Sequence, residues 1–299
     1  MQRKQAWYGR DWGLQARMAV TMLLLTALYL IFSLFLFSTT HLGYLLIVIP
    51  LAGLFFQYMY SDKLVLSSSG AHIINEQQAP ELFGIVQRLA QQADLPMPRI
   101  AVIDTPMPNA FATGRNPKRA VVAVTSGLIS QLPPAELEAV LAHEMTHIRN
   151  RDMLVMTMAG SFAAVAAWIL QMSFWFGMGD SRDRRDGGGN FAIFLLVTLA
   201  VQLISHMLVL ALSRYREYSA DRGGAILTGS PEQLQSALLR ISGTMQRIPT
   251  QDLRQAQPLS ALFFAAPKRE VVGELFSDHP SVQNRIARLQ ELERSLARV

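Results

Sequence analysis

Four long hydrophobic runs constrain the fold of this chain more than any other feature of its sequence. They cover residues 18–37, 42–60, 153–179 and 191–212. Each run is close to the ~20 residues that a helix needs to cross the hydrocarbon core of a bilayer. Only 16% of the chain is charged, whereas a typical soluble domain carries about 25% charged residues. We therefore expect a mainly α-helical membrane protein with four transmembrane helices.

The charges between the runs predict which side of the membrane each end faces. The tail 1–17 is basic, whereas the link 38–41 has no Lys or Arg. Because positive charge collects on the cytoplasmic side, the tail should lie in the cytoplasm and four crossings should return the chain there. The expected external loop, 180–190, contains three arginines, which conflicts with this rule. The alternative is that the segment 153–213 forms a shallow hairpin, which also returns the chain to the cytoplasm.

Two polar segments, 61–152 and 214–299, should build one cytoplasmic α+β domain together. The first segment mixes the apolar spacing of helices with short β-like runs, and the second is mainly helical in pattern. The expected elements are helices at 80–94, 133–150 and 281–296, and strands at 99–103, 109–114 and 120–125.

The composition also excludes several classes of site. The chain has no cysteine, which rules out a disulfide scaffold, a cysteine nucleophile, an iron–sulfur cluster and a Cys-ligated zinc. The net charge of +5 would suggest nucleic acid as a partner of a soluble protein. Here membrane topology explains the excess of positive charge, so we expect the lipid bilayer and no nucleic acid as partners.

The chemistry is indicated by one short motif in the expected helix 133–150. His143 and His147 are four residues apart, so they share a helix face and both imidazoles can bind one zinc ion. Glu144 follows the first histidine, and in such motifs this position serves as general base. The motif predicts a zincin-like catalytic domain with one zinc ion per chain.

A catalytic zinc needs a third protein ligand and an open coordination position. Glu217 and Asp221 continue the fourth hydrophobic helix toward an expected end at Gly223 and Gly224, and they lie four residues apart on one face. One of the two can bind the metal while the other accepts a hydrogen bond from a ligand histidine. His206 lies earlier in the same helix, and we interpret it as a packed or water-contacting side chain rather than a ligand.

Five motifs in order resemble the HtpX-type membrane zinc proteases, which are relatives of the CAAX-processing prenyl proteases. The motifs are Asn109-Ala110-Phe111-Ala112-Thr113-Gly114, His143 to His147, Arg216 to Asp221, Leu275-Phe276 before His279-Pro280, and Arg285-Ile286. The zinc motif alone is common to many metalloprotease families, but its combination with the strand from Asn109 to Gly114 is specific.

The resemblance implies a role for each site residue. It implies His143, His147 and Glu217 as zinc ligands and Glu144 as the base. It also implies that Asp221 orients a ligand histidine and that Arg285 lies nearby. His279 would approach the site and bind the oxyanion, and the strand Asn109, Ala110, Phe111, Ala112, Thr113 and Gly114 would bind substrate along its edge.

The function expected from this resemblance is zinc-dependent cleavage of misfolded or unassembled membrane proteins, in quality control or a stress response. The enzyme would be a multi-pass protein of the bacterial inner membrane with its site facing the cytoplasm. Two alternatives remain. One is a zinc-dependent membrane scaffold or adaptor without turnover, which the base Glu144 disfavours. The other is prenyl-protein processing, for which four spans are too few to enclose a large chamber.

Overall fold

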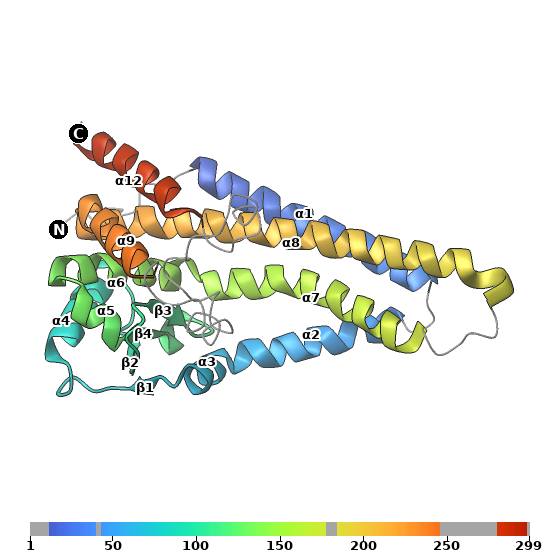
Figure 1. Cartoon of the computed structure of the whole chain (residues 1–299), viewed down its shortest axis with the longest axis horizontal. Coiled ribbons are helices and arrows are strands. Elements are labelled where there is room, and N and C mark those ends of the chain that lie inside the picture. Colours follow the sequence, from blue (N-terminus) through green and yellow to red (C-terminus); the bar gives the residue numbers. More distant parts are fainter. Residues whose placement is uncertain (1–11, 40–42, 178–183, 246–279, 298–299) are drawn as a thin grey trace. The chain divides into compact units, whose positions relative to one another are not determined.

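The computed structural model describes residues 12–39, 43–177, 184–245 and 280–297. It contains mainly helices and one small sheet (Figure 1). In chain order the elements are α1 (Trp12–Thr39), α2 (Gly43–Met59), α3 (Ser61–Ser69), β1 (His72–Ile73), α4 (Pro80–Gln92), β2 (Arg99–Ile103), β3 (Ala110–Thr113), the 3₁₀ helix η1 (Pro117–Arg119), β4 (Val121–Thr125), α5 (Ser126–Gln131), α6 (Pro134–Asn150), α7 (Asp152–Gly177), α8 (Arg184–Thr228), α9 (Pro231–Met245) and α12 (Val282–Leu296).

The chain divides into two compact units. The apolar unit contains Gln15–Met59 and Val155–Leu212. The polar unit contains the described residues up to Leu14, Tyr60–Leu154, and the described residues from Ser213 onward. Helices α1, α7 and α8 each contribute residues to both units.

The apolar unit is built from long hydrophobic helices. Three helical segments among the described residues are long and apolar enough to cross a membrane: Trp12–Ser38, Asp152–Met172 and Phe191–Thr228. The second predicted transmembrane run is also helical, as α2, but its described apolar part, Ile47–Met59, is shorter than the other three. A fourth crossing therefore stays a prediction. One core of this unit joins all four helices through Phe32, Leu36, Ile47, Val165, Ala166, Ile169 and Val201.

Two expectations about α8 were wrong. The helix begins at Arg184, so residues 184–190 of the expected external loop 180–190 are helical. It also continues past the expected stop at Gly223 and Gly224 to Thr228. Glycine costs a helix interior only about 1 kcal/mol relative to Ala, so a long helix can contain several. In this unit the side chain of His206 is exposed on α8.

The polar unit is organised around a four-stranded sheet with strand order β1-β2-β4-β3. β2 pairs with β4 in parallel, and β3 pairs with β4 in antiparallel. The three predicted strands are confirmed with small changes at their ends, whereas β1 was not predicted. All five residues of β4 are buried, as expected for a central strand covered on both faces. β3 lies at one edge of the sheet.

Helices cover both faces of this sheet. The main core packs residues of α4, α6, α9 and α12 with Val122 and Val124 of β4. On the other face, Val65 and Leu66 of α3 pack against residues including Phe111, Val121 and Ala123. The predicted helices at 80–94, 133–150 and 281–296 are confirmed as α4, α6 and α12, each within two residues at its ends. This packing fixes α6, the helix that carries the zinc motif, beside the edge strand β3.

Candidate metal centre

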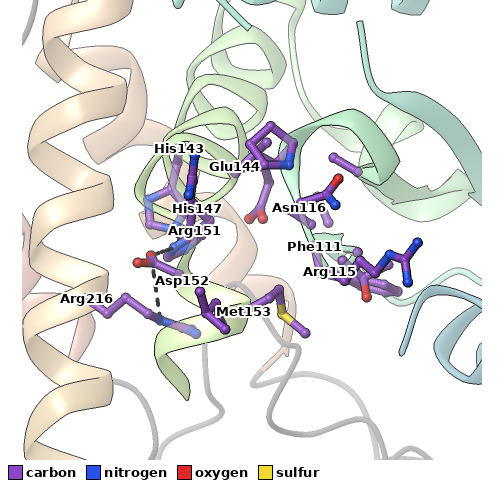
Figure 2. Close-up of a pocket in the computed structure, with 18 of the residues that line it drawn as sticks. Phe111, Arg115, Asn116, His143, Glu144, His147, Arg151, Asp152, Met153 and Arg216 are labelled. Atoms are coloured by element: carbon purple, nitrogen blue, oxygen red, sulfur yellow. Dashed lines mark hydrogen bonds and ion pairs between the residues drawn. The ribbon is translucent and has the colours of Figure 1, made fainter. Parts of the chain in front are cut away.

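α6 presents the zinc motif on a single buried face. His143 is 1% exposed and Glu144 is 4% exposed. One ligand atom from each of His143, Glu144 and His147 lies within 4.8 Å of the other two. The two imidazole rings meet edge to face, with ring centroids 4.6 Å apart. Figure 2 shows the Glu144 carboxylate between the histidines and the residues Phe111 and Asn116 across the pocket.

α8 brings Glu217 to the same point. Its Oε2 lies 3.5 Å from Nε2 of His143, and its Oε1 lies 3.5 Å from Nε2 of His147. The two Nε2 atoms are 3.0 Å apart. Glu217 is 2% exposed. Two imidazole nitrogens and one carboxylate therefore converge, and these are the ligand types of catalytic zinc sites that lack cysteine.

Gly224 allows this approach between the two helices. A Cβ atom at this position would lie 2.8 Å from the backbone nitrogen of His143 and 3.0 Å from its Cα. Any other residue would push α8 away from α6, because backbone atoms on a helix cannot move aside locally. The absent side chain of Gly224 therefore sets how closely Glu217 lies to the histidines of α6.

A buried chain of charges supports His143. Its Nδ1 lies 3.0 Å from Oδ1 of Asp221. Arg285 of α12 binds the same carboxylate with two hydrogen bonds, from Nε to Oδ2 at 2.8 Å and from Nη2 to Oδ1 at 2.5 Å. Nη1 of Arg285 also lies 3.7 Å from Oε2 of Glu217. Asp221 and Arg285 are thus placed to hold His143 and Glu217 in position.

The burial of the site shifts the pKa of its ionisable groups in the metal-free chain. Burial lowers the pKa of His143, but hydrogen bonds to Asp221 and Glu217 outweigh it and raise that pKa to about 9. Burial raises the pKa of Glu144, with His147 and His143 opposing. A carboxylate with a raised pKa is a better proton acceptor near neutral pH.

The outer edge of β3 faces the same pocket. The N–H of Thr125 donates to the carbonyl of Asn109 at 2.9 Å, so Asn109 turns its backbone toward β4. Because backbone direction alternates along a strand, Phe111 and Thr113 also face β4, whereas Ala110 and Ala112 face outward. The outward N–H of Ala112 donates to the Glu144 carboxylate. Among the described residues, no strand pairs with this edge.

The structure brings most of the predicted site residues together. The lining of one pocket includes the strand residues from Ala110 to Gly114, the motif residues His143, Glu144 and His147, and Glu217. Asn109 is buried at the start of β3 and does not line the pocket. His279, Leu275 and Phe276 lie outside the described residues.

Two polar residues of this pocket were missed by the sequence analysis. Oδ2 of Asp152 lies 2.6 Å from Nδ1 of His147, and Nε of Arg216 lies 3.8 Å from the same oxygen. Asp152 lies just after the end of α6. It is five residues after His147, and residues five apart do not share a helix face, so the spacing gave no signal. Arg216 was noted only as part of the longer motif.

Known proteins match most of this chain. The family model described as "Peptidase family M48" matches residues 76–293, which include the zinc motif, Glu217, Asp221 and Arg285. A "Protease HtpX homolog" from Moorella thermoacetica is 53% identical, over 96% of this chain and 97% of that protein. A "Protease HtpX homolog 2" from Methanosarcina acetivorans is 49% identical, over 98% of this chain and all of that protein.

A solved structure shows a similar fold. The crystal structure of Ste24p from S. mikatae superposes with a TM-score of 0.56 at 18% identity, covering 93% of this chain and 66% of that one. At this identity the likeness concerns the fold alone. The sequence matches carry the assignment, and they show that this chain belongs to peptidase family M48, as a membrane metalloprotease of the HtpX type.

Proposed function

We propose that this chain is a zinc-dependent endopeptidase that cleaves misfolded or unassembled membrane proteins at the cytoplasmic side of a bacterial inner membrane. In this proposal His143, His147 and Glu217 bind one zinc ion and Glu144 is the general base. The observation that carries the metal assignment is the convergence of Nε2 of both histidines with the Glu217 carboxylate, at separations of 3.0 and 3.5 Å.

These separations fit a tetrahedral zinc site. Ligand atoms at about 2.0–2.1 Å from a tetrahedral zinc lie roughly 3.3–3.4 Å from one another. The three observed separations of 3.0, 3.5 and 3.5 Å lie within a few tenths of an ångström of this value, so the three groups can bind one ion after small adjustments. Among the described residues, two imidazoles and the Glu217 carboxylate converge in this way, and a catalytic zinc site keeps a further position for water or substrate.

The residues around the metal have distinct chemical tasks. Zinc bound by these three ligands would supply a Lewis acid that acidifies water and polarises the scissile carbonyl. The Glu144 carboxylate accepts the proton of the attacking water and delivers it to the leaving amine nitrogen. Asp221, itself bound by Arg285, accepts the hydrogen bond from Nδ1 of His143, and this keeps Nε2 unprotonated for the metal. The proposed role of His279, as a hydrogen-bond donor to the oxyanion, rests on the family resemblance.

The third ligand can be tested directly. Glu144 also lies within 4.8 Å of both histidines, so it is the competing carboxylate. Glu217→Ala should lose most of its zinc, whereas Glu144→Gln should keep one zinc per chain, because only Glu217 spans both Nε2 atoms. Metal analysis of the purified variants measures this. Full zinc occupancy in Glu217→Ala would remove Glu217 from the ligand set.

The substrate is proposed to bind as an additional strand along β3. An extended peptide can pair with an exposed sheet edge through main-chain hydrogen bonds. The outward backbone groups of Ala110 and Ala112 lie at the edge of the pocket that contains Glu144. Their small side chains leave room for an incoming chain.

Removing one donor from this edge should weaken cleavage. Ala110→Pro deletes an outward N–H and should lower kcat/KM by about 2- to 13-fold, because one main-chain hydrogen bond of roughly 0.5–1.5 kcal/mol is lost. Zinc content and Tm serve as controls for the fold. A second variant, Ala112→Pro, removes the other outward N–H, which also donates to the Glu144 carboxylate, so its loss of rate combines both effects. If both variants are folded, bind zinc and cleave at the wild-type rate, β3 is not the substrate edge.

The cytoplasmic orientation of the polar unit is a separate proposal, supported by the basic tail and the uncharged link 38–41. The proposed parts are the basic tail 1–17, transmembrane helices at 18–60 and 153–213, and a catalytic domain from 61–152 and 214–299. Single introduced cysteines are specific labels, because the native chain has none. A cysteine at position 90 or 290 should react only after the membrane is permeabilised. Labelling of either position from outside would show that the polar unit faces the opposite side of the membrane.

The proteolytic function itself is tested with purified protein. Chelator-stripped enzyme should not cleave an unfolded membrane protein, and zinc should restore cleavage. The specific observation against a scaffold without turnover is the buried Glu144, placed beside the proposed metal and the substrate edge. Restored zinc without any cleavage of unfolded membrane or soluble substrates would favour the scaffold.

A further inference from the structure

Asp152 makes a short polar contact in the pocket. Its Oδ2 lies 2.6 Å from Nδ1 of His147, and the residue is 2% exposed. Figure 2 shows this contact, together with the ion pair from Asp152 to Arg216. Asp152 is the first residue of α7. It therefore belongs to a different helix from the histidine that it contacts.

A break between two helices creates this contact. In a continuous helix a residue five positions after His147 would point about 140° away from it. The chain instead turns at Arg151, which has a left-handed φ of 56° and ends α6. The N–H of Leu154 then donates to the carbonyl of Arg151 at 3.0 Å as α7 begins. This turn brings the Asp152 carboxylate back to the imidazole of His147.

The contact determines which nitrogen of His147 is available. A neutral imidazole that donates from Nδ1 to a carboxylate keeps the lone pair of Nε2 for a metal. Nε2 of His147 is the atom that faces His143 and Glu217, at 3.0 and 3.5 Å. His143 is arranged in the same way, because its Nδ1 lies 3.0 Å from Oδ1 of Asp221.

Arg216 lies close to the carboxylates of both Asp152 and Glu217. Its Nε lies 3.8 Å from Oδ2 of Asp152, and its Nη2 lies 3.3 Å from Oε1 of Glu217. The guanidinium thus bridges the carboxylate that contacts His147 and the carboxylate that faces both Nε2 atoms. The positive charge of Arg216 therefore lies beside the buried Asp152 carboxylate as well as beside Glu217.

We propose that Asp152 is the positioning residue of His147: it fixes the tautomer and the ring orientation that His147 needs to bind zinc. This inference rests on the proposed zinc site. It assigns one carboxylate to each ligand histidine, Asp221 to His143 and Asp152 to His147. The competing role for Asp152 is structural only, since an acidic residue in the first turn also stabilises the start of a helix.

Zinc affinity separates the two roles. Asp152→Ser keeps a polar residue at the start of α7 but is too short to reach His147, so its zinc Kd should rise by about 10–100-fold. Asp152→Asn keeps an acceptor oxygen for Nδ1 and should bind zinc much more tightly than Asp152→Ser. Competition with a chromophoric chelator measures both constants. The visible spectrum of the cobalt-substituted protein should change in Asp152→Ser, because the geometry at His147 changes.

Asp62→Asn is the matched control. Asp62 is also buried in the polar unit, and it pairs with Arg99 at 2.7 Å rather than with a histidine. This variant can lose stability but should keep the wild-type zinc Kd and cobalt spectrum. Equal loss of zinc in Asp62→Asn and Asp152→Ser would overturn the proposal, and so would a zinc Kd of Asp152→Ser within about twofold of wild type.

His147→Ala distinguishes this inference from the zinc site on which it rests. If wild type and His147→Ala bind zinc equally, the proposed ligand set itself has failed. If His147→Ala loses zinc and Asp152→Ser does not, the ligand set stands and only the positioning role of Asp152 is wrong.

Discussion

Glu144→Gln should bind one zinc per chain and cleave peptide bonds about 10²–10⁴-fold more slowly than wild type, the range that a general base contributes. The amide has the size of the carboxylate, so the buried position beside Ala112 remains filled. The amide of glutamine, however, cannot accept a proton at neutral pH. Zinc content and the initial rate of cleavage on one unfolded membrane-protein substrate measure the two expected results.

Glu138→Gln is the control for this prediction. Glu138 lies on the same helix, but its side chain is 32% exposed and pairs with Arg88 at 3.4 Å. This variant removes the same charge outside the pocket and should cleave at close to the wild-type rate. Wild-type turnover in Glu144→Gln would show that Glu144 is not the base. Loss of zinc in Glu144→Gln would instead make it a ligand.

Local patterns in the sequence predicted the elements that carry the proposed metal site. The spacing of His143 and His147 requires only that one helix continues for five residues, and the same holds for Glu217 and Asp221. The apolar periodicity of α4 and the apolar run of β4 also depend on neighbouring residues. Such features are visible in a sequence because their geometry repeats with a fixed period.

Features that depend on contacts between distant segments could not be predicted. Gly224 was interpreted as a helix stop. Its close contact with His143 involves another helix, so no local pattern in the sequence indicates it. Asp152 gave no signal, because the turn before it is made by Arg151 and not by a glycine. The length of α8 is a further example, since local glycine propensity is outweighed in a long helix.

Arg285→Ala should cause a large loss of stability in the polar unit. Arg285 is 1% exposed and binds Asp221 through two hydrogen bonds, with Glu217 3.7 Å away. Removing one partner of a buried ion pair leaves an uncompensated charge and costs about 3–5 kcal/mol. This corresponds to a decrease in Tm of roughly 6–20 °C for a domain of 150–250 residues.

Thermal unfolding in detergent measures this effect, and Arg88→Ala is the matched control. Arg88 pairs with Glu138 at the surface, where its side chain is 57% exposed, so its removal should cost at most about 1 kcal/mol. The loss in Arg285→Ala should be smaller in zinc-loaded protein, because the metal also neutralises Glu217. Arg285→Lys keeps the charge but not the two-point geometry, so its Tm should lie between those of Arg285→Ala and wild type. A Tm of Arg285→Ala equal to that of Arg88→Ala would show that Asp221 does not depend on Arg285 for its charge balance.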